Sequence, residues 1–159
     1  MSREILFKAK RVDNGEWVEG YLLKANRMDF IFPTVTNGSF DGLKNVMKFI
    51  NPCFLVNSET ICQYTGLTDK NGKKIWENDI LRYSYDYEDS PWLKSKGLTN
   101  EDIKYYIGEV FWSDWRASWA VCGNGKSICF NQDVFKYNRN PNRTEVIGNV
   151  FDNPELLEN

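Results

Sequence analysis

The chain has 159 residues, of which 42% are hydrophobic and 15% aromatic, and it contains no histidine. This length fits a single domain over residues 1–159 that can bury a core without a metal or disulfides. Its 20 basic and 22 acidic side chains give a formal net charge of −2, which argues against a general polyanion-binding protein. The absence of histidine excludes Ser-His-Asp and Cys-His triads as well as histidine metal ligands.

No apolar run approaches the ~20 residues that span a bilayer, and the first residues do not form a secretion signal. We therefore expect a cytoplasmic protein without a membrane partner. The four cysteines are Cys53, Cys62, Cys122 and Cys129. None of them forms a Cys-x-x-Cys pair, which is the strong signal for zinc. Since disulfides are disfavoured in the cytoplasm, we expect four small, mostly buried apolar side chains.

The first half of the chain is rich in short β-prone segments. The expected strands cover residues 5–12, 16–23, 30–32, 54–56, 60–65, 75–76 and 80–83. Asn14 and Gly15 tolerate the positive φ of a tight hairpin turn, and Pro33 stops the third strand. Residues 36–52 are loop-like, and residues 69–74 form a turn.

Residues 84–106 interrupt this pattern. Ser90 with Pro91, and Thr99 with Asp102, resemble helix starts, so we expect one or two short helices around residues 90–106. The remaining expected elements are a hairpin of residues 108–112 and 118–122, a strand at 127–130, a strand or helical turn at 131–137, a polar loop at 138–142, a strand at 144–151 and a helical turn at 153–157. Many short strands with Gly and Asn turns predict a mainly β fold, a small partly open barrel or sandwich of antiparallel strands.

Two acidic motifs raise the question of a metal or catalytic site. Residues 69–72 begin like a calcium loop, but Gly72 comes two positions too early, so the segment predicts a turn. Glu77 and Asp79 would lie on one face of a strand, where a metal or catalytic pair is geometrically possible. We favour bonds from Asp79 to backbone N–H groups. We expect no catalytic, cofactor-binding or metal-binding residue.

The aromatic residues suggest where the protein makes contacts. Trp112 and Trp119 are predicted to be core residues, whereas Trp115 and Arg116 are predicted to lie at the hairpin tip and to be partly exposed. Tryptophan and arginine are common at interaction hot spots and can also stack on bases. The candidate interaction surface comprises Trp115, Arg116, Tyr87, Trp92 and Tyr105, with Tyr85 and Tyr106 as further exposed candidates.

Two basic segments are interpreted as solvent-exposed and not as binding sites. Residues 136–143 are the densest basic stretch and have the groups to touch phosphates, but acidic residues surround them in sequence. We favour a solvated loop. Alternation along the first strand places Lys8 and Lys10 on its water side.

Three blocks, residues 7–22, 59–80 and 145–157, together resemble the YopX family of phage and prophage proteins. The resemblance implies a phage or prophage origin, a location in the bacterial host cytoplasm and a mainly β fold, and it brings no catalytic residue. Asn78 stands where the family usually has glycine, but asparagine also adopts the left-handed conformation. Residues 84–106 match no family pattern and are a variable insertion.

The residues of these three blocks have roles in the fold that do not involve catalysis. Gly66, Gly72 and Gly148 suit turns or close approaches, Thr65 and Asp79 suit backbone capping, and Trp17, Tyr64 and Trp76 supply core area. Our leading hypothesis is a non-enzymatic protein-binding or assembly module that contacts another protein or itself as a homo-oligomer. A nucleic-acid-binding small β-barrel is the alternative. An enzyme using Asp79 and Glu77 is the third hypothesis.

Overall fold

The computed structural model describes residues 4–34, 53–84, 95, 97, 105–123, 132–133 and 143–158. Apart from Ser95, which is helical, and Gly97, which is in a turn, the expected helices over residues 90–104 lie outside the described residues. The strand at 127–130 and the candidates Tyr85, Tyr87 and Trp92 lie outside them as well. Backbone contacts divide the chain into two compact units, Met1–Tyr64 and Thr65–Asn159. Each unit has a buried core of its own.

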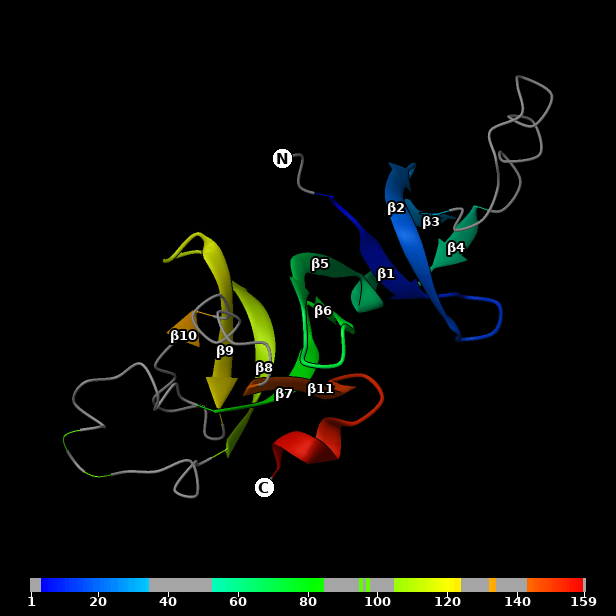
Figure 1. The fold of residues 1–159 in the computed structure, drawn as a ribbon. Coiled ribbons are helices and arrows are strands. Elements are labelled where there is room, and N and C mark those ends of the chain that lie inside the picture. The colour runs from blue at the N-terminus through cyan, green and yellow to red at the C-terminus, as the bar shows by residue number, and fades with distance from the viewer. Residues whose placement is uncertain are drawn as a thin grey trace. The chain divides into compact units, whose positions relative to one another are not determined.

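The first unit is an antiparallel sheet with the strand order β4-β3-β2-β1-β5 (Figure 1). Its elements are β1 (Phe7–Lys10), β2 (Trp17–Ala25), β3 (Met28–Pro33), β4 (Phe54–Val56), the 3-10 helix η1 (Ser58–Thr60) and the start of β5 (Cys62–Thr68). Ala9, Ile31 and Val56 form its buried core, and Phe7 and Leu22 pack against them.

Two tight turns shape this sheet. The predicted turn between β1 and β2 is confirmed, with Gly15 at φ 74° and the Arg11 N–H donating to the Glu16 carbonyl at 2.9 Å. Between β2 and β3, Asn26 and Arg27 have φ values of 48° and 66°. Two successive positive φ values are typical of the two-residue hairpin turn whose twist matches the flanking strands.

The second unit contains a five-stranded sheet in the order β10-β9-β8-β7-β11, and the end of β5 pairs with β6. Its elements are β6 (Lys74–Trp76), β7 (Asp79–Ser84), β8 (Tyr105–Ser113), β9 (Ser118–Gly123), β10 (Gln132–Asp133), β11 (Thr144–Asn149) and the 3-10 helix η4 (Pro154–Leu157). The named pairs within this sheet are all antiparallel.

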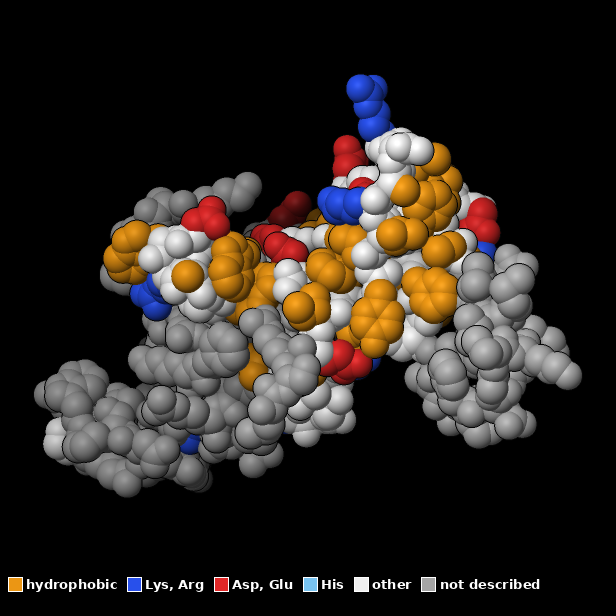
Figure 2. Space-filling model, turned by 90° about the horizontal axis from the view of Figure 1, so that it is seen from above, with side chains coloured by type: hydrophobic (Ala, Val, Ile, Leu, Met, Phe, Trp, Pro, Cys, Tyr) orange, Lys and Arg blue, Asp and Glu red, His pale blue; other side chains and the backbone are white. Residues whose placement is uncertain are grey.

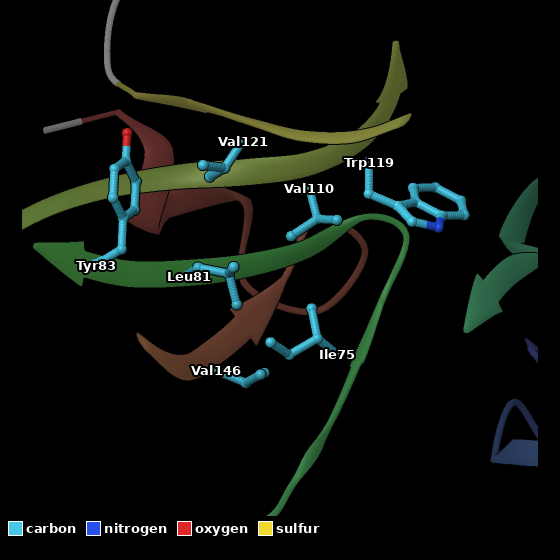
Figure 3. Packing of buried hydrophobic residues seen from close by; sticks show 7 residues of the cluster. All are labelled: Ile75, Leu81, Tyr83, Val110, Trp119, Val121 and Val146. Carbon is cyan, nitrogen blue, oxygen red and sulfur yellow. The ribbon is translucent and has the colours of Figure 1, made fainter. Parts of the chain in front are cut away.

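The core of the second unit lies on one face of this sheet. Side chains that alternate along the strands supply it, together with one residue of β6: Leu81, Tyr83, Val110, Trp119, Val121, Val146 and Ile75 (Figure 3). Burying one such aliphatic side chain stabilises a fold by about 1.5–3 kcal/mol. The alternation of apolar residues in the sequence therefore has its physical basis in this cluster.

The predicted mainly β fold is confirmed, as is the helical turn at the C-terminal end. The strand alternative at residues 131–137 is realised as β10. The helical prediction is wrong for Tyr105 and Tyr106, which open strand β8 and pair with Ser84 and Tyr83. The pairing with β7 decides their conformation, and helix-start motifs upstream carry no information about it.

The cysteines differ from one another more than predicted. Cys62 is buried, and its thiol donates to the Thr60 carbonyl at 3.3 Å, whereas Cys53 is exposed. Cys122 is disulfide-bonded, so the expectation of four apolar thiols is wrong for Cys122 and Cys53. Sequence spacing does not report which sulfur atoms a fold brings together, because bonding depends on the distance and direction of the side chains.

Candidate functional site

Asp69 organises the turn that follows β5. Its Oδ1 accepts hydrogen bonds from the backbone N–H groups of Asn71 at 2.8 Å and Lys73 at 2.9 Å. Its Oδ2 accepts from the Val146 N–H of β11 at 3.0 Å. Burial raises the pKa of this carboxyl group, but the three N–H donors outweigh burial and leave the pKa below its ordinary value of 3.8. The predicted turn is confirmed, and the carboxylate is engaged with the backbone.

Asp79 is likewise engaged in local structure. It is buried, and its Oδ2 accepts from the Trp76 N–H at 2.9 Å. The preceding Asn78 has φ 62°, so the predicted left-handed conformation is confirmed. Among the described residues, no group of three or more Cys, Asp and Glu side chains is placed to hold a metal ion. The capping interpretation of Asp79 is therefore confirmed.

The other block residues also shape the backbone. The Thr65 hydroxyl donates to the Ile75 carbonyl at 2.8 Å and accepts from the Leu67 N–H at 3.2 Å. Gly66 and Gly72 have φ values of 87° and 78°. A Cβ on Gly148 would lie 2.7 Å from the Asn153 Oδ1. The predicted turn at Gly72, the capping by Thr65 and the close approach at Gly148 are confirmed, whereas Gly66 lies within strand β5.

The tip of the β8–β9 hairpin is an exposed aromatic feature. Trp115 is 85% exposed, and the Arg116 guanidinium carbon lies 5.4 Å from its ring centroid. The Arg116 N–H donates to the Ser113 carbonyl at 3.1 Å and closes the turn. The predicted exposure of Trp115 and Arg116 is confirmed, and Tyr105 is also exposed.

The two tryptophans below the tip differ. Trp119 is buried at 2% exposure, as predicted, but Trp112 is 42% exposed, so its prediction as a core residue is wrong. The two residues are paired across β8 and β9, with their rings edge to face at 5.2 Å between centroids. Alternation places Trp112 on the core side of the sheet, but it lies one residue from the hairpin turn, where less protein covers it.

Trp17 is half-buried instead of being a full core residue, and so is Tyr64, whereas Trp76 is buried as predicted. The ammonium groups of Lys8 and Lys10 lie 4.9 Å and 5.5 Å from the Trp17 ring centroid. Both lysines therefore lie on the side of β1 opposite to the core, as alternation predicts. Cation–π contact keeps them partly buried against the indole.

The outer face of the first unit's sheet carries apolar side chains that the sequence predictions overlooked. Leu23 of β2, Phe30 of β3 and Leu55 of β4 pair directly across three strands. Leu23 and Leu55 are 52% and 39% exposed, and Tyr21, one alternation step from Leu23, is 52% exposed. Hydrophobic side chains are gathered at the surface in Figure 2. We call Tyr21, Leu23, Phe30, Phe32 and Leu55 the apolar row.

A sequence signal for the apolar row does exist. A strand with one buried face alternates between apolar and polar residues, but residues 21–23 and 30–32 are continuously apolar. The opposite face is used by the core, where Leu22, Ile31 and Phe54 pair across the same strands. Such continuous runs indicate a sheet that is apolar on both faces.

Arg143 is the one residue of the basic stretch 136–143 that lies within the described part of the chain. It is 7% exposed, so the expected solvated loop is wrong for this residue. Its side chain lines a small pocket in the second unit together with Lys70, Arg82 and Glu145. Buried guanidinium groups are rare unless they are paired or have a specific role.

Within the described residues, no helix has the length and apolar composition needed to cross a membrane. Residues 6–158 match the family model described as YopX protein. Protein EF1440 from Enterococcus faecalis, a solved structure, is similar to the chain at 22% sequence identity and a TM-score of 0.44, over 98% of this chain and 99% of that one. No curated protein sequence matches the chain.

Proposed function

The chain belongs to the YopX family, and we propose that it is a non-enzymatic protein-binding or assembly module that contacts a protein partner or a second copy of itself. The apolar row is the observation that carries this proposal. A half-solvated antiparallel sheet normally turns polar side chains to water. Contiguous exposed apolar residues are typical of interaction surfaces.

The energetic gain from covering this surface is appreciable. Full burial of a leucine or tyrosine-sized apolar side chain contributes about 1.5–3 kcal/mol. Tyr21, Leu23 and Leu55 are 39–52% exposed, so covering the rest of each contributes about 1 kcal/mol. The three together favour a bound state by about 3 kcal/mol, which is roughly a hundredfold in the dissociation constant.

The absence of an enzymatic role is part of the proposal and rests on how the motif acids are used. The carboxylates of Asp69 and Asp79 accept hydrogen bonds from backbone N–H groups. These features support binding through a surface over turnover of a substrate in a cleft.

The proposed setting is the cytoplasm of a bacterium that carries the phage or prophage, and its support is the family resemblance. Disulfides are disfavoured there, so this setting predicts that Cys122 is a thiol in growing cells. Rapid alkylation of intact cells followed by mass spectrometry tests this expectation. Cys122 oxidised in freshly quenched cells would contradict a cytoplasmic location.

Sedimentation equilibrium and affinity capture of the Leu23→Glu variant test the proposed function. The new carboxylate would be desolvated by any partner on the apolar row, so association should weaken by at least about tenfold. Ile5→Glu is the matched control, because Ile5 is 56% exposed in the same unit but outside the row. A wild-type protein that stays monomeric and captures no more protein than Leu23→Glu would refute the proposal.

A further inference from the structure

Within the described residues, two exposed turns carry the same pair, an asparagine followed by a glycine. They are Asn14-Gly15 before β2 and Asn71-Gly72 before β6. An asparagine in such a pair readily loses its side-chain amide, because glycine has no Cβ to shield its backbone nitrogen. That nitrogen can attack the asparagine Cγ. The surroundings of each asparagine decide how easily the attack occurs in the folded protein.

The two glycines have closely similar surroundings. Gly15 and Gly72 are exposed, and their φ values are 74° and 78°. No atom lies within 4 Å of the position that a Cβ would take on either glycine. Each N–H donates to a backbone carbonyl at 3.0 Å, that of Arg11 for Gly15 and that of Asp69 for Gly72. The attacking nitrogens are therefore equally open and equally bonded at the two turns.

The two asparagine side chains differ. Asn14 Oδ1 accepts from the Glu16 N–H at 3.0 Å, and Asn14 Nδ2 donates to the Glu16 carboxylate at 2.7 Å. Both ends of this carboxamide must be released before its Cγ can turn toward the following nitrogen. The exposed Asn71 is held by its backbone N–H, which donates to Asp69 Oδ1 at 2.8 Å. Among the described residues, none bonds to the Asn71 carboxamide, so its Cγ can turn freely.

We propose that Asn71 is a site of spontaneous deamidation in the folded protein and that Glu16 protects Asn14 from the same reaction. The Gly72 nitrogen gives its proton to hydroxide and forms a bond to the Asn71 Cγ. The bond from Cγ to Nδ2 breaks, and ammonia leaves with a proton from water, which regenerates the hydroxide. Water then opens the resulting succinimide ring at either of its carbonyl carbons. The products are aspartate and isoaspartate at position 71, and one water molecule is consumed.

The modification acts on the turn that Asp69 holds against β11. Asp69 Oδ1 accepts from the N–H groups of residues 71 and 73, and Oδ2 accepts from the Val146 N–H. In isoaspartate the Cβ becomes part of the main chain, which places one more atom between these two turn N–H groups. They then lose the spacing that lets both reach one oxygen. Either product also adds a negative charge beside the buried Asp69 carboxylate, so the turn is loosened from β11.

Incubation of the intact protein at mildly alkaline pH, followed by mass spectrometry, tests the proposal. Digestion with endoproteinase Glu-C at acidic pH stops the reaction and places the two asparagines in separate peptides, residues 5–16 and 60–77. Asn71 should be lost at least about tenfold faster than Asn14, because Asn14 must first give up two hydrogen bonds, one of them to a charged group. Labelling by isoaspartyl methyltransferase identifies isoaspartate at position 71.

Two comparisons show whether the folded structure causes the difference. In concentrated urea the rates at Asn14 and Asn71 should converge, because both asparagines precede glycine and the turn contacts are gone. Glu16→Ala removes the carboxylate that holds Asn14 and should speed the loss of Asn14 several-fold. Asn71 in the same molecule is the matched control and should react at its wild-type rate.

The consequence for the turn is measured separately. Asn71→Asp carries the new charge without the extra main-chain atom, so the isoaspartate form, separated by chromatography, should unfold at a lower urea concentration than Asn71→Asp. Equal stability of the two would overturn the loosening of the turn. Equal loss of Asn14 and Asn71 in the folded protein, faster loss of Asn14, or a Glu16→Ala variant with unchanged loss of Asn14 would overturn the proposed site and its protection.

Discussion

The Asp69→Asn substitution should destabilise the protein strongly although it is nearly isosteric. Asp69 Oδ1 accepts from two turn amides, and Oδ2 accepts from the Val146 N–H. The asparagine oxygen can keep the two turn bonds. Its NH₂ group then faces the Val146 N–H, so two donors meet and the bond between the turn and β11 is lost.

The magnitude follows from that one buried contact. A hydrogen bond to a charged group contributes about 1.5–3 kcal/mol, and a buried N–H left without an acceptor costs about 1–3 kcal/mol. These two values describe overlapping parts of the same loss. We therefore expect the free energy of unfolding to fall by about 2–4 kcal/mol.

Urea denaturation of wild type and Asp69→Asn across pH measures this loss. The folded pKa of Asp69 lies below its ordinary value of 3.8, so the stabilisation is fully present above that value and is lost as pH falls through the folded pKa. The difference between the two proteins should be largest near neutral pH and should shrink below pH 3.8.

Asp13→Asn is the matched control, because it makes the same chemical change at an exposed turn. The Asp13 pKa is lowered mainly by its hydrogen bond to the Arg11 side chain, and its carboxylate is solvated. We expect little change in stability there. If Asp69→Asn were as stable as Asp13→Asn at neutral pH, or if its deficit grew on acidification, the structural role of Asp69 would be refuted.

Three further predictions concern packing and backbone conformation, each measured as the free energy of unfolding. Trp119→Ala should destabilise by about 3–5 kcal/mol, whereas Trp115→Ala should stay within about 0.5 kcal/mol; equal losses would contradict the assigned core. Gly72→Ala should cost about 1 kcal/mol at φ 78°, and Gly72→Asn should cost less. Gly20→Ala should cost about 3 kcal/mol, because its Cβ would meet the Phe32 carbonyl oxygen; an unchanged stability would contradict the close strand pairing at Gly20.

Much of the β architecture was predictable because it follows from local signals. The Asn-Gly turn before β2, the β8–β9 hairpin and the left-handed Asn78 depend on residues near one another in sequence. The division of the chain into two units was not predictable from the sequence. It depends on contacts between residues throughout the folded chain. The exposure of Trp112 was missed because alternation gives the face of a strand and says nothing about how far the covering layer extends.

The candidate sites were less predictable than the fold. Asp69 was recognisable as a turn residue, but its bond to Val146 joins positions 77 residues apart. The pocket around Arg82 likewise depends on the register of β7 with β8 and β11. The continuous apolar residues of β2 and β3 are a sequence signal for the apolar row. That these side chains are exposed could be recognised only from the structure.

Site-specific photo-crosslinking in living bacteria tests most directly whether the protein works by docking through its apolar row. A photoreactive amino acid at Leu55 of strand β4, in the apolar row, should crosslink to a defined protein or to a second copy of the chain. The same amino acid at Asn14, in the exposed turn before β2, should give no such product. Defined crosslinks from Leu55 alone are the predicted result, and an absence of crosslinks from Leu55, or the same products from both positions, would contradict it.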